Sequence, residues 1–262
     1  MLFFNTTLMQ KGNTYRNIPD SYELRLLAFI DILGWADLLK KSETNKELFS
    51  LLLDASNKLS NVAINQKEFL SGFSDEAKKI VHFESYPIIS HFSDTIVMSC
   101  IPDYSAATIL IHHVQNICRT FLQKEYLTRG AIVLGNIHHS EQDIFGPALV
   151  DAYLLEKNIA FYPRIIIDRK ALPLIHQSTK VGEETTYPRN VRKDFDDMLY
   201  LDILGGVPTG WQNEKRHSFW NEQKLLEDAK TRMELHRNDT KKLQKHAWLV
   251  GYLEQIVNEC SK

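Results

Sequence analysis

The chain has 262 residues, 44% of them hydrophobic and 24% charged, which is the composition of a globular protein and excludes a disordered, collagenous or coiled-coil chain. With 31 Lys+Arg against 33 Asp+Glu the formal net charge is −2, so no global charge favours nucleic acid or an anionic membrane. The three cysteines, Cys100, Cys118 and Cys260, are widely spaced and form no CxxC pair, which argues against a disulfide framework and favours a reducing cytoplasm.

The first predicted element is a buried strand. Leu26 to Ile30 is a continuous apolar run, typical of a strand covered on both faces, and it ends at Asp31. After Gly34, apolar residues recur at helical spacing and predict one or two helices before residue 70. The stretch from Met1 to Lys11 lacks the layout of a signal peptide, and no apolar run approaches the roughly 20 residues that span a bilayer. We therefore expect a soluble protein.

A hairpin, a helix and a further strand follow. Two apolar stretches flank Phe92-Ser93-Asp94, which predicts a β-hairpin with Asp94 at its tip. Ser105 to Leu122 carries apolar residues at three- and four-residue spacing without Gly or Pro, which predicts a helix. Gly130 to Gly135 is strand-like, and we expect a turn or a second short strand from Asn136 to His139.

The next elements complete a recognisable order. Gly146-Pro147 opens a predicted helix through Ile159, with proline at a first-turn position where its missing N–H does no harm. Arg164 to Asp168 is the following predicted strand. The order β-α-α-ββ-α-β-(β)-α-β favours an α+β fold of ferredoxin-like type, in which helices pack on an antiparallel-containing sheet.

The C-terminal part has a different character. Phe195 to Asp202 is strand-like, whereas Gln212 to Asn238 and Thr240 to Cys260 show helical spacing and predict a helical appendage. The lysines between 241 and 245 are interpreted as a solvated helix face. We expect three parts: an N-terminal extension at 1–22, a main domain at 23–186, and a C-terminal strand and helical extension at 187–262.

Asp31 and Asp94 are the pair most suggestive of chemistry. Asp31 follows a central strand and precedes a glycine loop, while Asp94 lies at a hairpin tip, and in a ferredoxin-like sheet these places are adjacent. Two carboxylates so close repel each other, and a divalent cation removes the conflict. Mg²⁺ or Mn²⁺ is usually held by one or two carboxylates plus substrate phosphates. The alternative is that Asp31 caps the following helix and Asp94 is an ordinary turn residue.

Several short motifs occur in a fixed order along the chain. They are Phe92-Ser93-Asp94-Thr95, Thr128-Arg129-Gly130-Ala131, Phe145-Gly146-Pro147-Ala148-Leu149, Tyr153-Leu154-Leu155-Glu156, Tyr162-Pro163-Arg164-Ile165 and Lys245-His246-Ala247-Trp248-Leu249. Residues 26–34, 88–99 and 127–168, which contain most of them, resemble the catalytic domain of class III nucleotidyl cyclases. The sequences of these motifs are most similar to those of the bacterial Pycsar pyrimidine cyclases of antiphage defence.

The resemblance implies a two-metal site. Asp31 and Asp94 would bind two Mn²⁺ or Mg²⁺ ions, with the Ile32 carbonyl as a further ligand, one ion activating the ribose 3′-hydroxyl and the other holding the triphosphate. Attack on the α-phosphorus with loss of pyrophosphate needs positioning and charge neutralisation, which a metal pair supplies. The resemblance also implies a homodimer in which these aspartates of one chain face base- or phosphate-contacting groups of the other.

The base-facing positions depart from the adenylate-type pattern. Such enzymes carry a purine-reading Lys four residues before the second metal Asp, and this chain has Ser90 there. Tyr86 and Phe92 lie nearby and can form a wall that excludes purines. Asp143 occupies the place of a base-contacting acid, with an ordinary loop acid as the alternative. Phe29, Ser90, Tyr86 and Asp143 are therefore the expected substrate-binding residues.

The transition-state arginine of these enzymes is also missing. The corresponding helical stretch, Val150 to Leu154, contains no Arg, and Arg129, Lys157 and Arg164 are candidates to replace it. We expect Arg129 to be the catalytic cation, because a lone Arg entering a buried strand must find an anion. A surface ion pair or helix-end charge is the alternative for each.

Together these features predict a lyase, a pyrimidine nucleotide cyclase that converts UTP or CTP to the 3′,5′-cyclic monophosphate and pyrophosphate in Pycsar antiphage defence. UTP is preferred because uridylate cyclases are the more frequent in that family. The product would activate a separate effector, and the cyclase itself would bind neither nucleic acid nor membrane. Two alternatives are another two-metal nucleotidyl transferase, disfavoured by the lack of a GGDEF-like hairpin, and a catalytically inactive nucleotide sensor, disfavoured because both aspartates are present.

Overall fold

The computed structural model describes residues 21–50, positions 52, 53 and 57, and residues 86–140, 142–175, 190–205 and 221–260. Almost all of the expected N-terminal extension, most of the second helix expected before residue 70, and the expected helical start at 212–220 lie outside these residues. The strands are β1 (Glu23–Ile32), β2 (Ile88–Phe92), β3 (Thr95–Cys100), β4 (Thr128–His139), β5 (Ile144–Phe145), β6 (Ile165–Ile167), β7 (Val191–Lys193) and β8 (Leu199–Leu201). The helices are α1 (Trp35–Ser42), α4 (Tyr104–Gln123), α5 (Pro147–Ile159), α6 (Leu172–Ile175), α7 (Glu222–Leu235) and α8 (Thr240–Cys260), with a 3₁₀ turn at Arg169–Ala171.

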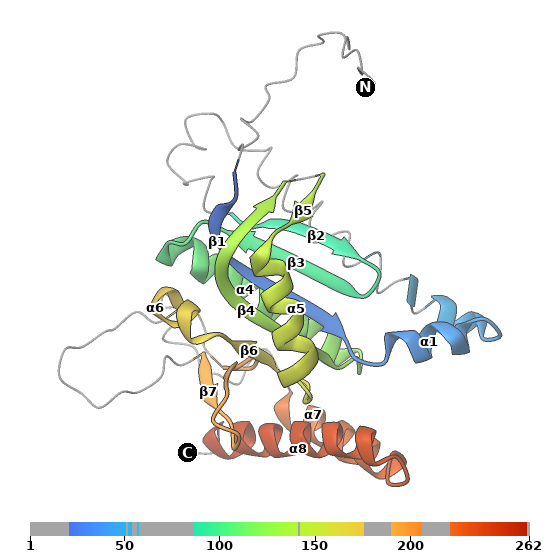
Figure 1. The fold of residues 1–262 in the computed structure, drawn as a ribbon. Helices are drawn as coiled ribbons and strands as arrows, with labels where there is room; N and C mark the ends of the chain where they lie inside the picture. Colours follow the sequence, from blue (N-terminus) through green and yellow to red (C-terminus); the bar gives the residue numbers. More distant parts are fainter. Residues whose placement is uncertain are drawn as a thin grey trace, which may run out of the picture.

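An eight-stranded sheet forms the centre of the molecule (Figure 1). The strand order is β2-β3-β1-β4-β6-β8-β7, and β5 pairs with β4 outside this path. β1 lies between β3 and β4 and is antiparallel to both, whereas β4 and β6 are parallel. The expected antiparallel-containing sheet with packed helices is therefore confirmed.

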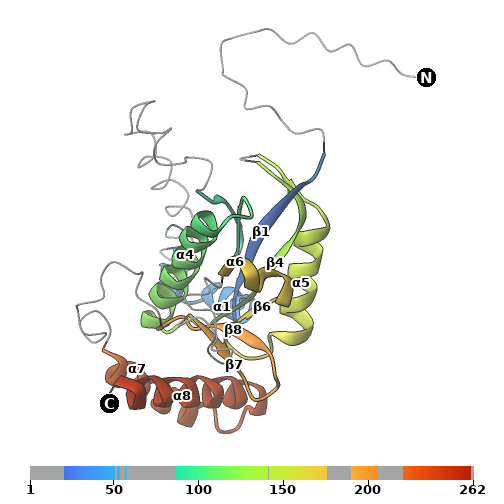
Figure 2. The ribbon, with the colours of Figure 1, turned by 90° about the vertical axis from the view of Figure 1, so that its left-hand side faces the viewer.

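The sheet is covered on both faces, because side chains alternate along each strand. Leu26, Ala28 and Ile30 of β1 join the core under α4, whereas Leu27 and Phe29 join a second core under α5. Figure 2 shows α4 and α5 on opposite sides of β1. The continuous apolar run of β1 thus has the cause predicted for it, burial on both faces.

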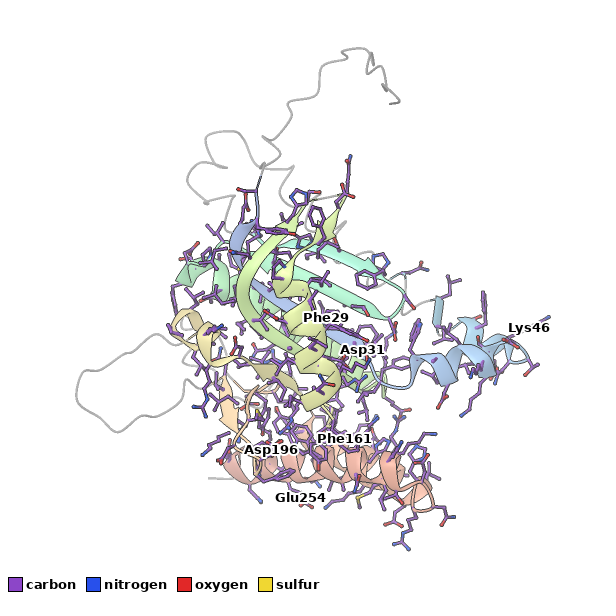
Figure 3. The ribbon with its side chains drawn as sticks, in the orientation of Figure 1. Phe29, Asp31, Lys46, Phe161, Asp196 and Glu254 are labelled. Carbon is purple, nitrogen blue, oxygen red and sulfur yellow. The ribbon has the colours of Figure 1, made fainter. Side chains whose placement is uncertain are left out.

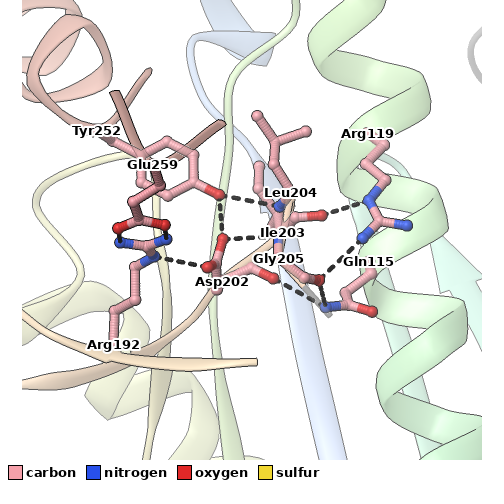
Figure 4. A network of polar contacts seen from close by, with 9 residues as sticks. All are labelled: Gln115, Arg119, Arg192, Asp202, Ile203, Leu204, Gly205, Tyr252 and Glu259. Carbon is pink, nitrogen blue, oxygen red and sulfur yellow. Dashed lines mark hydrogen bonds and ion pairs between the residues drawn. The ribbon is translucent and has the colours of Figure 1, made fainter. Parts of the chain in front are cut away.

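The C-terminal helices α7 and α8 pack against each other and are tied to the sheet by buried polar groups (Figure 4). The Tyr252 hydroxyl of α8 donates to Asp202 Oδ1 at 2.5 Å, and Arg192 Nε of β7 donates to Asp202 Oδ2 at 2.6 Å. Gln115 of α4 donates to the Asp202 carbonyl at 2.8 Å. The segment after β8 is therefore fixed to α4 and α8 at once.

Two expected strands differ from the observed ones. The predicted strand from Phe195 to Asp202 is instead a hairpin, in which Asp194–Met198 turns between β7 and β8. Asp197 has φ 63°, a left-handed conformation that a strand does not contain, and Asp is among the residues that tolerate it. The expected break near Asn136 is absent, because β4 runs uninterrupted to His139.

Within the described ranges, no helix has the length and apolar character needed to cross a membrane.

Candidate active site

The predicted site residues of the central strands share one face of the sheet. Asp31 of β1 is paired with Thr95 on β3 and with Arg129 on β4, so the three side chains point the same way. Phe29, two residues earlier, faces the same side and lies under α5. Figure 3 shows Phe29 and Asp31 beside the C-terminal half of α5. The end of β1, the start of β4 and this half of α5 therefore meet at one place.

Arg129 is held between two carboxylates. Its Nε donates to Asp31 Oδ2 at 3.1 Å and lies 2.5 Å from Glu156 Oε1 of α5. The exposed fractions of the three side chains are 26% for Arg129, 17% for Asp31 and 4% for Glu156. Glu156 Oε1 is buried and has no hydrogen-bond partner, although Arg129 lies beside it as an ion pair. A single guanidinium thus serves two largely buried acids.

The charges around Asp31 do not balance. Burial raises the pKa of Asp31 to about 6, and the charges of Asp94 and Glu156 add to that effect, while Arg129 opposes it. The pKa of Glu156 is also raised, first by burial. The acids Asp31, Asp94 and Glu156 therefore lie near one another, and the charges of the other two disfavour the ionised form of Asp31.

The hairpin between β2 and β3 brings Asp94 to this site. Phe92 pairs with Thr95, so Ser93 and Asp94 form the turn, with Ser93 at φ 55°. Because Thr95 is the partner of Asp31, the turn lies next to the end of β1. The alternative role of Asp31 as a helix cap is not observed, because Gly34 occupies the N-cap of α1 and no side chain caps it.

The carboxylate pair suits a hard metal ion that shares its ligands with a substrate. Searched over the described residues, no group of three or more His, Cys, Asp or Glu side chains has the arrangement of a metal site. Asp31 and Asp94 supply two carboxylates, and Mg²⁺ is commonly bound by one or two carboxylates plus substrate phosphates. Ile32 follows Asp31 at the end of β1, where the Leu33 N–H bonds to the Leu127 carbonyl at 2.8 Å. The two carboxylates and the mutual repulsion of their charges fit such an ion.

Two glycines in the motifs around the site lie where a side chain would clash with neighbouring backbone. A Cβ on Gly130 would lie 2.0 Å from the Phe29 carbonyl oxygen, so only glycine allows β4 to approach β1. Gly146 has φ 145° and a Cβ there would lie 2.8 Å from Ile137 Cα. The first glycine sets Arg129 opposite Asp31, and the second seats the start of α5 on β4.

Ser90 belongs to a second polar cluster on the same sheet face. Its Oγ lies 3.0 Å from His139 Nε2, and His139 Nδ1 lies 2.8 Å from Ser99 Oγ. Arg25 Nε donates to Ser99 Oγ at 2.9 Å. His139 comes from the end of β4, which curves far enough to reach β2 and β3 (Figure 1).

The remaining expected substrate residues lie apart from Asp31. Tyr86 is partly buried just before β2. Asp143 is exposed in the turn between β4 and β5, where its N–H bonds to Ser140 Oγ at 3.0 Å. Asp143 follows the end of β4, and among the described residues it has no hydrogen bond or ion pair with Asp31.

Of the three candidate cations, Arg129 is the one in contact with Asp31. The side chain of Arg164 is 0% exposed and pairs with Asp194 and Asp196 of the C-terminal hairpin. Lys157 is exposed and donates to the Tyr153 hydroxyl at 3.2 Å.

Sequence reasoning missed two residues of the site. Glu156 is on the buried stripe of α5 with Ala148 and Ala152, and that four-residue spacing was the available signal. Lys245 of α8 is not on a solvated face as expected: it is partly buried, with Nζ 5.6 Å from the ring centre of Phe161. Figure 3 shows Phe161 between α5 and α8.

The surroundings of Lys245 connect α8 to the site. Burial lowers the pKa of Lys245, the positive charge of Arg129 lowers it further, and the charges of Asp239 and Asp31 oppose the shift. The ammonium is therefore close enough to sense both residues of the central ion pair. Its spacing from Trp248 and Tyr252, at three and seven residues, was the sequence signal for an inward-facing position.

Comparisons with known proteins give a structural likeness but no sequence match. No protein-family model matches the chain, and no curated protein matches it. Among solved structures, a bacterial light-regulated adenylyl cyclase is similar at a TM-score of 0.42 and 12% sequence identity, over 70% of this chain and 91% of that one. Function is therefore inferred from the residues of the site.

Proposed function

We propose that this chain is a nucleotidyl cyclase of the class III type that converts a pyrimidine nucleoside triphosphate, UTP ahead of CTP, to its 3′,5′-cyclic monophosphate and pyrophosphate. The observation that carries the proposal is the pairing of Asp31 with Asp94: burial raises the pKa of Asp31 to about 6, and the charge of Asp94 adds to the shift. Two carboxylates in that state gain from a divalent cation. The order β2-β3-β1-β4, with β1 antiparallel to both neighbours, agrees with the ferredoxin-like arrangement that we expected and supports the proposal.

The residues of the chain have separate tasks in this reaction. When held by Asp31 and Asp94, with the Ile32 carbonyl beside them, Mg²⁺ or Mn²⁺ supplies charge neutralisation and a lowered pKa for the ribose 3′-hydroxyl. Arg129 binds phosphate oxygens, and Glu156 of α5 orients the Arg129 guanidinium through their ion pair. In-line attack of the 3′-oxygen on the α-phosphorus forms the new P–O bond as the bond to pyrophosphate breaks.

The class III resemblance favours a homodimer with shared sites. Arg129 lies at the start of β4 opposite Asp31, and His139 at the end of β4 contacts Ser90. A head-to-tail pair would place the metal-binding end of one chain against the base-reading end of its partner. Tyr86, Phe29 and Asp143 belong to the proposed substrate surface on the same basis.

The product would be a second messenger in antiphage defence of the Pycsar type, acting on a separate effector in the cytoplasm. The cyclase itself would contact neither nucleic acid nor membrane. The net charge of −2 supports that part of the proposal.

A catalytically inactive nucleotide sensor is the second candidate. It is favoured by one contact, the hydrogen bond from Arg129 to Asp31 Oδ2, which occupies an oxygen that a metal ion would need. In a cyclase this contact must yield when metal and substrate bind.

One experiment separates the two candidates. Purified protein is incubated with Mn²⁺ and each of the four ribonucleoside triphosphates, and products are resolved by mass, with Asp94→Asn as the matched control. Cyclic UMP as the main product, absent from the control, is the expected result. Nucleotide binding without any cyclic product supports the sensor, and ATP turnover equal to or above UTP turnover defeats the pyrimidine claim.

A further inference from the structure

Arg164 connects β4 to the hairpin formed by β7 and β8. Its carbonyl accepts from the Gly130 N–H at 3.1 Å, and Gly130 is the residue after Arg129 on β4. Its side chain is 0% exposed and pairs with Asp194 and Asp196 of the hairpin turn, with Nη1 2.9 Å from Asp196 Oδ1. The strand that carries Arg129 is therefore tied to the C-terminal hairpin.

Trp248 extends this connection into α8. Its Nε1 donates to Asp194 Oδ2 at 2.7 Å, so one carboxylate serves both Arg164 and Trp248. The Trp248 ring also stacks on Tyr162, with ring centres 6.2 Å apart and 17° between the planes. Charge-assisted hydrogen bonds are directional as well as strong, so they fix the geometry of the groups that they join. We call Arg164, Asp194 and Trp248 the α8 anchor.

Lys245 lies three residues before Trp248, and its ammonium is at the end of α5 (Figure 3). Nζ is 5.6 Å from the ring centre of Phe161, which follows the helix turn that contains Glu156, the ion-pair partner of Arg129. Among the described residues, no carboxylate forms a hydrogen bond or ion pair with Lys245, and the charge of Arg129 contributes to the lowering of its pKa. An ammonium beside a second cation, without an acid of its own, is placed to bind an anionic ligand.

We propose that the α8 anchor positions Lys245, so that Lys245 and Arg129 bind phosphate oxygens of the same triphosphate. The proposal rests on the proposed function, since its ligand is the substrate of that same site. Two cations on separate elements bind one polyphosphate well only while the distance between them is maintained, because each must stay within a hydrogen-bond length of its oxygen. The C-terminal helices are then part of the substrate site.

Binding of inorganic tripolyphosphate, measured by titration calorimetry with Mn²⁺ present, is the first test and needs no turnover. Trp248→Phe keeps an aromatic ring, removes the Nε1 donor and should weaken binding about fivefold. Tyr252→Phe is the matched control, because it removes a buried hydroxyl one turn later on α8 that bonds to Asp202 instead. It should lower the free energy of unfolding without changing the affinity. An equal loss of affinity in the two variants, or no loss in Trp248→Phe, overturns the proposal.

A double variant tests whether the α8 anchor acts through Lys245. Lys245→Met alone should weaken tripolyphosphate binding about tenfold, and adding Trp248→Phe should weaken it little further. In turnover of UTP, Trp248→Phe should raise KM about fivefold and leave kcat nearly unchanged. Losses of affinity that multiply in the double variant, or a lower kcat at an unchanged KM, contradict a positioning role.

This proposal and the proposed function can fail separately. Tripolyphosphate binding that depends on Trp248 through Lys245, without cyclic product from any ribonucleoside triphosphate, keeps the role of the α8 anchor and removes the cyclase. Cyclic product formed by Trp248→Phe at an unchanged KM keeps the cyclase and removes the role of the α8 anchor. Absence of both tripolyphosphate binding and cyclic product removes both.

Discussion

Arg129 and Asp31 face each other directly across the antiparallel pair of β1 and β4, with Nε 3.1 Å from Oδ2. The same guanidinium also serves Glu156, and Asp94 adds a further negative charge nearby. Arg129 lowers the pKa of Asp31, whereas burial and the charges of Asp94 and Glu156 raise it. A further cation beside Asp31 would oppose the effect of those two acids.

Replacement of Asp94 by Asn should act on both activity and titration. Turnover should fall about a thousandfold or more, because one carboxylate ligand and several kcal/mol of charge stabilisation are lost. The pKa of Asp31 should fall below about 6 in the metal-free protein, since a neighbouring negative charge has been removed. Carboxyl carbon-13 NMR measures the pKa, with Asp103→Asn as a distant control. Near-normal turnover, or an unchanged pKa, contradicts the assignment.

Arg129→Met should unfold more easily as well as lose activity. It leaves the mostly buried Asp31 and Glu156 without their cation, at a cost of about 2 kcal/mol in the free energy of unfolding. Adding Glu156→Gln should restore part of that stability and none of the activity. Urea denaturation and initial rates measure the two effects, with Lys157→Met on the exposed side of α5 as the control. A double variant no more stable than Arg129→Met speaks against the shared pairing.

Lys245→Met should weaken the binding of the triphosphate. The ammonium is close enough to Arg129 and Asp31 to sense both charges, so it is placed to attract phosphate oxygens. We expect KM to rise about tenfold while kcat changes little. Lys241→Met, an exposed lysine one turn earlier on α8, is the matched control. An equal change of KM in the two variants would contradict a role of Lys245 in binding the triphosphate.

Mixed dimers should show complementation. Asp31→Ala removes the metal-binding end of one chain, and Ser90→Trp blocks the base-reading end of the other. A heterodimer of the two variants should hold one intact site and one doubly defective site. Activity should return on mixing, with heterodimers confirmed by native mass spectrometry. Heterodimers that form and stay inactive would place the whole site inside one subunit.

Stability should decrease as the pH falls below the ordinary histidine range. His246 is buried against His236, with ring centres 4.9 Å apart, and its pKa is lowered from 6.5 to about 4. Between these two pH values the unfolded chain binds a proton that the folded chain does not. The free energy of unfolding therefore decreases by about 1.4 kcal/mol for each unit by which the pH is lowered. His246→Phe should remove this contribution, measured by urea denaturation at pH 7, 6 and 5. An unchanged slope would contradict it.

Elements with a strong local pattern were predictable from the sequence. α8 has the predicted bounds, Thr240–Cys260, and α4 extends the predicted helix by one residue at each end. The β2–β3 hairpin has Asp94 in its turn, as expected. Apolar periodicity and turn residues decided these elements, and both are properties of neighbouring residues.

Elements decided by distant contacts were not predictable in the same way. β7 and β8 are three residues each, too short for a period, and the turn between them holds Asp194 and Asp196 as partners of the buried Arg164. Lys245 and Glu156 reach the site from helices far apart in the chain. Periodicity indicated that such residues face inward, but only the packing of α5 and α8 shows what they face.

β4 approaches β1 so closely at Gly130 that a Cβ there would lie 2.0 Å from the Phe29 carbonyl oxygen. Substitution of this glycine therefore affects the positions of its neighbours on the strand. Gly130→Ala would push β4 off β1 and draw Arg129 away from Asp31, although glycine contributes no reacting group. In an alanine scan, substitution of Gly130 and of Arg129 would therefore both reduce activity. Spectroscopic evidence of misfolding in Gly130→Ala alone would show that Gly130 acts by spacing the strands and that Arg129 acts as a functional cation.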